Sequence, residues 1–267
     1  MKITTGENRQ APSGRHELKH YINAADYAQL RARLRALTKP DANAGGDGTY
    51  KVRSLYFDNY SDKAVMEKLS GLGRREKFRL RYYNGDTSFI RLEKKSKANR
   101  LSYKEGAGIT AGQCGELLAG RYDCLKARGG LCITGSGTEG GDGLPQSHDG
   151  AVAGISGGIA SGEAALLMEL YTKIHCQSLR PKNIVDYTRE AYTYRAGNVR
   201  VTFDSDIRTS NAVAGFLDPS LATVPAAGAM IMEIKYDGFL PDVIRDILQI
   251  GWRNQTEFSK YIVARMV

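Results

Sequence analysis

The chain has 267 residues, of which 42% are hydrophobic and 25% are charged, and its formal net charge at pH 7 is +9. This length allows one large domain or two small ones, and the composition is ordinary for a soluble globular protein, which argues against a disordered chain. The positive charge favours anionic partners in general, such as nucleic acid, acidic membrane surfaces, nucleotides or phosphate polymers, and does not choose among them.

The cysteines and the apolar runs narrow the class further. Cys114, Cys124, Cys132 and Cys176 form no CxxC pair and no Cys/His cluster, which argues against a metal–thiolate site and favours reduced thiols. No apolar run approaches the roughly 18 residues that span a bilayer, and the first residues, MKITTGENRQ, lack the apolar core of a signal peptide. We therefore expect a cytoplasmic protein with no membrane segment in this chain.

The first third of the chain predicts strands with one charged face. Residues 1–14 are polar, and we expect them to form a disordered lead-in. The stretch RHELKHYI (15–22) alternates so that Glu17 and Lys19 share one strand face. Asn23 then caps a helix in which Tyr27, Leu30, Leu34 and Leu37 recur at helical spacing, and Lys39-Pro40 ends it. A strand over YKVRSLYFDN (50–59) and a short helix before Gly71 follow.

The stretch KFRLRYYNGDTSFIRLEKKSK (77–97) predicts a β-hairpin, because two runs rich in aromatic and branched residues flank Asn84-Gly85, which suits a tight turn. Side chains alternate between the faces of a strand. One face therefore carries six cations and a single carboxylate, namely Lys77, Arg79, Arg81, Arg91, Lys95, Lys97 and Glu93. Such a density repels itself unless water, acids or a polyanion lie against it.

Further elements complete the chain. Lys104 lies in SYKEG, at a strand or its edge, and a helix is predicted from Thr110 through Leu125. Residues 128–162, rich in Gly, Ser and Thr, predict a flexible surface loop. A helix then precedes Arg180-Pro181, two extended runs (184–195 and 198–208) form a hairpin, and AMIMEIKYDG is a final strand with Glu233 on its charged face. A helix begins at Pro241, and the terminal segment carries Lys260.

At least five strand segments thus pair an apolar face with a face rich in Arg, Lys or Glu. An open antiparallel sheet facing solvent is one explanation for each strand alone. If the strands close with their charged faces inward, the lumen must be wet and hold anions, because unpaired buried cations are too costly. Arg clamps phosphate oxygens, Lys acts as a mobile charge and Glu can hold a metal that bridges phosphates. We predict an α+β fold, an antiparallel β-barrel tunnel with a charged lumen and flanking helices, as one domain over residues 15–267.

The chain resembles the VTC domain, the polyphosphate-polymerase branch of the triphosphate tunnel metalloenzymes, which are related to the CYTH phosphatases. The matching stretches follow the family's order over nearly the whole chain: RHELKHYI, VRSLYFDN with EKLSG, KFRLRYY, IRLEKKSK, DYTREAY with VRVTFDSDI, MEIKYDG and FSKYIVAR. Three features depart from the family pattern. His20 stands where an aromatic residue is usual, Lys94 replaces an apolar residue, and the stretch 128–162 looks like an insertion.

The resemblance implies transfer of the γ-phosphoryl group of ATP to a growing polyphosphate chain, with Mn²⁺ or Mg²⁺ as cofactor. Its tunnel residues map onto a catalytic group that holds the triphosphate (Arg79, Arg81, Lys95 and Arg200) and onto a group that lines the path of donor or product (Lys19, Lys104, Arg189 and Lys260). Its metal-binding glutamate maps onto Glu233. The implied partners are ATP and inorganic polyphosphate, and whether a membrane partner protein receives the product stays open.

Three other functions remain open at this stage. A tripolyphosphatase or nucleoside triphosphatase of the same fold would use the same residues, with water in place of the acceptor phosphate. A polyphosphate-binding module would bind without turnover. A nucleic-acid-binding module would combine the basic strands with base stacking on tyrosines. Against this last function, Glu17, Glu93 and Glu233 on the cationic faces would repel a nucleic-acid backbone, whereas they suit a metal-bound triphosphate.

Overall fold

The computed structural model describes residues 15–41, 44–98, 101–126, 160–249 and 255–267. The predicted disordered lead-in (1–14) and nearly all of the predicted Gly-rich loop lie outside these residues. The last three residues of that loop, 160–162, instead begin a helix.

The described residues form an α+β fold around one antiparallel sheet of ten strands. In chain order the strands are β1 (His16–Ile22), β2 (Lys39–Pro40), β3 (Thr49–Asp58), β4 (Arg74–Tyr83), β5 (Asp86–Ala98), β6 (Leu101–Ile109), β7 (Arg180–Tyr194), β8 (Val199–Ser210), β9 (Val224–Ala227) and β10 (Met230–Tyr236). The predicted hairpin is formed by β4 and β5, where Asn84 and Gly85 supply the positive φ angles of the turn.

Six α-helices belong to the described residues: α1 (Ala24–Leu37), α2 (Lys63–Leu69), α3 (Ala111–Leu118), α4 (Ala160–Gln177), α5 (Asp242–Ile247) and α6 (Lys260–Arg265). Asn23 caps α1 as predicted, because its side chain accepts a hydrogen bond from the backbone N–H of Asp26. The continuous helix predicted from Thr110 through Leu125 is wrong in length. α3 ends at Leu118, Gly120 adopts a φ of +79°, and a short 3₁₀ turn (Tyr122–Leu125) follows.

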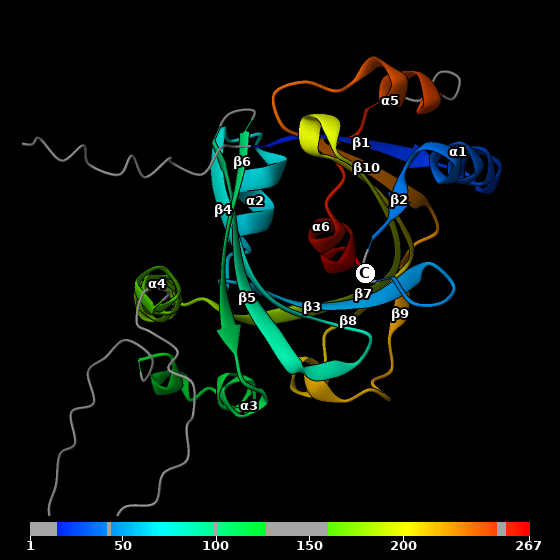
Figure 1. Ribbon diagram of the computed structural model, residues 1–267. Helices are drawn as coiled ribbons and strands as arrows, with labels where there is room; N and C mark the ends of the chain where they lie inside the picture. The colour runs from blue at the N-terminus through cyan, green and yellow to red at the C-terminus, as the bar shows by residue number, and fades with distance from the viewer. Residues whose placement is uncertain (1–14, 42–43, 99–100, 127–159, 250–254) are drawn as a thin grey trace, which may run out of the picture.

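The predicted closed barrel is also wrong. The strand order is β1-β10-β8-β7-β3-β4-β5-β6, with β2 beside β7 and β9 beside β8. The sheet curls until its edge strands approach each other, as Figure 1 shows. No ladder joins β1 to β6 in the described part of the chain, where the two edges meet only at the isolated bridge between Arg15 and Ser102. The result is a strongly curled open sheet with a concave and a convex face.

Strand alternation divides the side chains between these two faces. On β4, Phe78 and Leu80 are fully buried in a cluster with Leu167 and Leu170 of α4 on the convex side. A second convex cluster packs Leu30 and Leu34 of α1 and Ile244 of α5 against β8 and β10. The helices of both clusters, α1, α4 and α5, lie outside the curled sheet (Figure 1), so the concave face is left for the charged side chains.

Helix α6 occupies part of the concave side. In Figure 1 it lies within the curl of the sheet, where Tyr261, Ile262 and Ala264 pack against strand residues such as Val52 and Val185. The Tyr261 hydroxyl donates to Asp58 Oδ2 at 2.9 Å, which fixes the start of the helix. An apolar plug therefore fills one part of the concave face and leaves the rest to polar groups.

Two smaller features complete the description. Of the four cysteines, Cys114, Cys124 and Cys176 are free thiols, and Cys132 lies outside the described residues. None of the helices among the described residues is long and apolar enough to cross a membrane.

Candidate functional site

A cavity of about 390 Å³ opens on the concave face of the sheet. We call it the main cavity. The side chains of all nine predicted site residues line it: Lys19, Arg79, Arg81, Lys95, Lys104, Arg189, Arg200, Glu233 and Lys260. The structure thus brings together residues from seven strands and one helix, while their separate roles stay predictions.

The strand period explains this convergence. On β4 the odd-numbered residues Lys77, Arg79 and Arg81 point into the main cavity, while the even-numbered Phe78 and Leu80 enter the convex core. Because β1, β5, β6, β7, β8 and β10 also alternate, each contributes its charged face to the same side of the sheet. Lys260, at the first turn of α6, completes the wall.

Arg79, Arg81 and Glu93 form one group in the wall. Arg79 donates to Glu93 Oε2 through Nε at 2.8 Å, and Lys104 Nζ lies 2.6 Å from Glu93 Oε1. Arg81 is 3.6 Å from the same carboxylate, and its hydrogen-bond acceptors include the hydroxyls of Ser54 and Tyr187. Burial raises the pKa of Glu93, but the three cations outweigh it and hold that pKa well below its usual range. Glu93 therefore remains a carboxylate that fixes the orientation of Arg79.

Arg189, Asp204 and Lys260 form a second group. Arg189 makes a bidentate pair with Asp204, with distances of 2.6 and 2.8 Å, and Lys260 Nζ contacts the same carboxylate. Asp204 is fully buried. Its burial raises its pKa, but Arg189 and Lys260 lower it to about 2. Asp204 thus fixes the positions of Arg189 and Lys260, two of the predicted substrate-binding cations.

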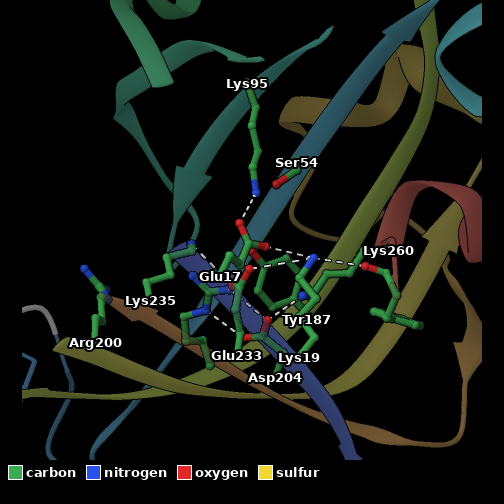
Figure 2. A network of polar contacts seen from close by, with 12 residues as sticks. Glu17, Lys19, Ser54, Lys95, Tyr187, Arg200, Asp204, Glu233, Lys235 and Lys260 are labelled. Carbon is green, nitrogen blue, oxygen red and sulfur yellow. Dashed lines mark hydrogen bonds and ion pairs between the residues drawn. The ribbon is translucent and has the colours of Figure 1, made fainter. Parts of the chain in front are cut away.

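Glu17, Lys19 and Glu233 form a third group, with Lys95 and Lys235 beside them (Figure 2). Glu17 has close ion pairs, at 3.0 Å to Lys19 and 2.5 Å to Lys95. Glu233 is different, because its cation contacts lie at 3.4 Å for Lys235 and at 3.7 Å for both Lys19 and Arg189. The Glu233 carboxylate is therefore buried, but its shortest ion pair is longer than the shortest ion pairs of Glu17 and Glu93.

The pKa values in this group follow from mutual compensation. Burial and the adjacent Glu233 raise the pKa of Glu17, but Lys19 and Lys95 outweigh them and leave it lowered. Burial also raises the pKa of Glu233, and the positive charges of Lys235 and Lys19 reverse the effect, so that its pKa lies well below the usual value. Both glutamates are therefore anions.

Arg200 lies at the rim of the main cavity. Its guanidinium is 2.5 Å from Asp41 Oδ2 and donates to the Tyr50 hydroxyl at 2.9 Å. Figure 2 shows it apart from the central carboxylates. Arg200 is one of the four residues predicted to hold the triphosphate. Its guanidinium is paired with Asp41 and not with the glutamates in the middle of the main cavity.

Two lysines in the wall were absent from the predicted set. Lys77 lies two residues before Arg79, and Lys235 lies two residues after Glu233. Strand alternation already placed Lys77 on the charged face of the hairpin, and the same alternation puts Lys235 on the face of Glu233, but the resemblance assigned a site role to neither. Burial lowers the pKa of Lys77 to about 7, and its ammonium lies 5.4 Å from the centre of the Tyr56 ring. Burial lowers the pKa of Lys235 to about 8, although Glu233 opposes the change.

The main cavity has a large excess of positive charge. Among the described residues that line it, eleven are lysines or arginines and three are glutamates. Because like charges in a partly desolvated wall repel one another, this arrangement gains from any bound polyanion. The chemistry that fits best is recognition of several linked phosphates.

The acidic side chains of the wall are the groups that could hold a divalent cation. No group of three or more His, Cys, Asp or Glu side chains is placed to hold a metal in the described part of the chain. Mg²⁺ commonly uses one or two carboxylates and completes its shell with water and substrate phosphates. Glu233, which lacks a tight ion pair, with Glu17 beside it, fits this mode of binding.

One family model covers nearly the whole chain. The family model for the VTC domain matches residues 14–267. A search of curated proteins gave no match. Among solved structures, a candidate adenylate cyclase from Bacillus halodurans is 11% identical, with 88% of this chain and 87% of that chain covered and a TM-score of 0.43. A protein from Pyrococcus horikoshii OT3 is 12% identical, with 88% and 84% covered and a TM-score of 0.36.

Proposed function

The chain belongs to the VTC domain family, and we propose that it is a metal-dependent polyphosphate polymerase. In this proposal the γ-phosphoryl group of ATP is transferred to the end of a growing inorganic polyphosphate chain inside the main cavity. The observation that carries the proposal is the excess of cations: eleven basic side chains and three glutamates among the described residues surround a single cavity.

This reaction suits a wall of cations. The attacking oxygen belongs to the terminal phosphate of the acceptor, so the protein supplies no nucleophile. Catalysis then consists of positioning two polyanions against each other and neutralising the charge that they bring together. Both tasks need several fixed donors rather than one reactive side chain.

The geometry suggests how the cations divide these tasks. Arg79 is held by Glu93, whereas Arg81 donates mainly to neutral hydroxyls and so keeps more of its charge available for phosphate. We assign both to the transferred phosphoryl group, together with Lys95. Arg189 and Lys260, which Asp204 fixes, line the path next to it.

Glu233 and Glu17 would hold Mn²⁺ or Mg²⁺ on the same wall. A cation held there would supply charge neutralisation for the substrate phosphates. Lys19 and Lys235 contact Glu233 and keep it ionised, which is the state that a metal ligand requires.

The test is incubation of the full chain with ATP and Mn²⁺ or Mg²⁺, followed by a gel stained for polyphosphate and an assay of free phosphate. The proposal predicts long polymer. Free phosphate without polymer would favour the hydrolase, and retention of added polyphosphate without turnover would favour a binding module.

A matched pair of variants tests the metal site. Glu233→Gln removes the charge at nearly constant volume, and we expect metal-dependent turnover to fall by about 10²- to 10³-fold. Glu116→Gln is the control, because Glu116 lies on α3, where it pairs with Arg121 outside the cavity. Unchanged activity of Glu233→Gln in a folded protein would contradict the assignment.

A further inference from the structure

A second, smaller cavity of about 100 Å³ adjoins the main cavity. We call it the side cavity. The two cavities share wall residues, including Lys77 and Lys95. Beyond these, the side cavity is lined by Lys68 of α2, Arg75 of β4 and Lys97 of β5. The basic wall therefore continues past the predicted site.

The register of β4 and β5 shows how it continues. Lys77 lies opposite Lys95, and the next pair on the same face is Arg75 opposite Lys97. By contrast, Arg79 in the main cavity lies opposite the acid Glu93. Like charges directly opposite each other destabilise a sheet. Two successive cation–cation pairs therefore need an anion on this face.

In the side cavity that anion is Glu257. Its carboxylate contacts Lys68 Nζ and lies 3.6 Å from the Arg75 guanidinium and 3.7 Å from Lys97 Nζ. The three cations are mostly shielded, whereas the Glu257 side chain is 67% exposed. An exposed carboxylate thus reaches into a cluster of three cations at the outer end of the basic wall.

One carboxylate does not neutralise this cluster. Burial lowers the pKa of Lys68, and the positive charges of Arg75 and Lys19 add to that effect, so that its pKa remains lowered although Glu257 opposes the change. A phosphate chain presents several acceptor oxygens and charges in a row, and its charge-assisted hydrogen bonds are stronger than an exposed ion pair. Such a chain would replace Glu257 with a gain in electrostatic energy.

We propose that Lys68, Arg75 and Lys97 form an exit subsite for a linear polyphosphate, which Glu257 occupies as an internal counter-anion until the chain displaces it. The inference rests on the proposed function. A short anion such as tripolyphosphate fills the main cavity, and only a longer chain also reaches the exit subsite along the Lys77–Lys95 pair.

The experiment compares two probes on the full chain without ATP: inorganic tripolyphosphate and long-chain polyphosphate, each titrated at several salt concentrations. Glu257→Gln should raise the affinity for the long chain by about two- to fivefold, the range of an exposed ion pair, and leave the affinity for tripolyphosphate unchanged. Lys97→Met should lower the affinity for the long chain only. It should also reduce the slope of log affinity against log salt by about 0.7, as expected for one lost phosphate contact.

Glu116→Gln and Lys126→Met, on the surface around α3, are matched controls of the same charge changes and should alter neither affinity. If tripolyphosphate binds but Glu257→Gln and Lys97→Met leave long-chain binding as it is in the native protein, the exit subsite is wrong and the proposed function stands. If neither probe binds the native chain, the proposed function fails and the exit subsite fails with it.

Discussion

The convex and concave faces of the sheet are built from the same strands and behave as opposites. On β4, Leu80 of the convex face is fully buried among apolar side chains, while its neighbours Arg79 and Arg81 on the concave face line the main cavity. Apolar burial stabilises the fold without needing a partner molecule. The concave wall, in contrast, carries more cations than its carboxylates can neutralise.

Even-numbered residues of β4 contribute to stability through the convex core, and odd-numbered residues contribute to binding through the main cavity. A substitution at an even-numbered position of β4 should change the free energy of unfolding, and one at an odd-numbered position should change the affinity for anions. Surplus charge at a functional site is commonly maintained at some cost in stability. Matched variants on the two faces test this separation of stability from binding.

The largest expected effect is on the convex face. Leu80→Ala removes a fully buried side chain from the cluster beneath α4, and we expect it to lower the free energy of unfolding by about 2–5 kcal/mol. Denaturant titration of the full chain measures this. Val224→Ala, at an exposed apolar position on β9, is the control and should cost less than about 0.5 kcal/mol.

A smaller effect of a different kind is expected one residue away. Arg81 donates to neutral hydroxyls and lies 3.6 Å from Glu93. Arg81→Met should weaken tripolyphosphate binding by about 1.5–3 kcal/mol, the range for hydrogen bonds to charged groups. The free energy of unfolding without anion should change by no more than about 1 kcal/mol, because one surplus cation is removed. A large loss of stability with unchanged binding would reverse the roles of the two faces.

The dependence on pH should have opposite signs for stability and for binding. Burial lowers the pKa of Lys77 to about 7, against about 10.4 in the unfolded chain. Between these values the unfolded state binds the extra proton, so the free energy of unfolding of the anion-free chain rises with pH, by at most about 1.4 kcal/mol per unit. A bound anion favours the protonated lysine, so anion affinity should fall over the same range.

Lys77→Met tests this sign. The variant should flatten both pH profiles, measured by denaturant titration and by tripolyphosphate binding. The Tyr56 phenol, whose pKa the nearby Arg79 and Lys77 lower to about 7 against its burial, remains and leaves a residual slope. Profiles identical to those of the native chain would show that Lys77 does not titrate in this range.

The charged faces could be predicted from sequence because strand alternation is a local property. The pattern placed Arg79 and Arg81 on one face of β4, and the structure confirms this placement. Closure of the sheet is not local. It depends on whether β1 and β6 pair along their length, and they meet only at Arg15 and Ser102 in the described residues. The ion pairs were equally beyond reach, because Arg189 and Lys260 meet at Asp204 through the fold alone.

The smallest expected effect concerns a charged side chain on the convex face. Lys94 is a cation on the convex side of β5, and its side chain is 13% exposed. Its ammonium lies 2.7 Å from Glu169 of α4 and 3.4 Å from Glu105, so it joins the sheet to the helix by an ion pair. Lys173 also contacts Glu169, at 3.3 Å, and would retain part of the charge balance.

Lys94→Met keeps the packing of the stem, and we therefore expect the free energy of unfolding to fall by no more than about 1 kcal/mol. Tripolyphosphate affinity should not change, because the ammonium lies on the far side of the sheet from the main cavity. Weakened anion binding in this variant would show that charge on the convex face reaches the concave one, and the separation of the two faces would then be wrong.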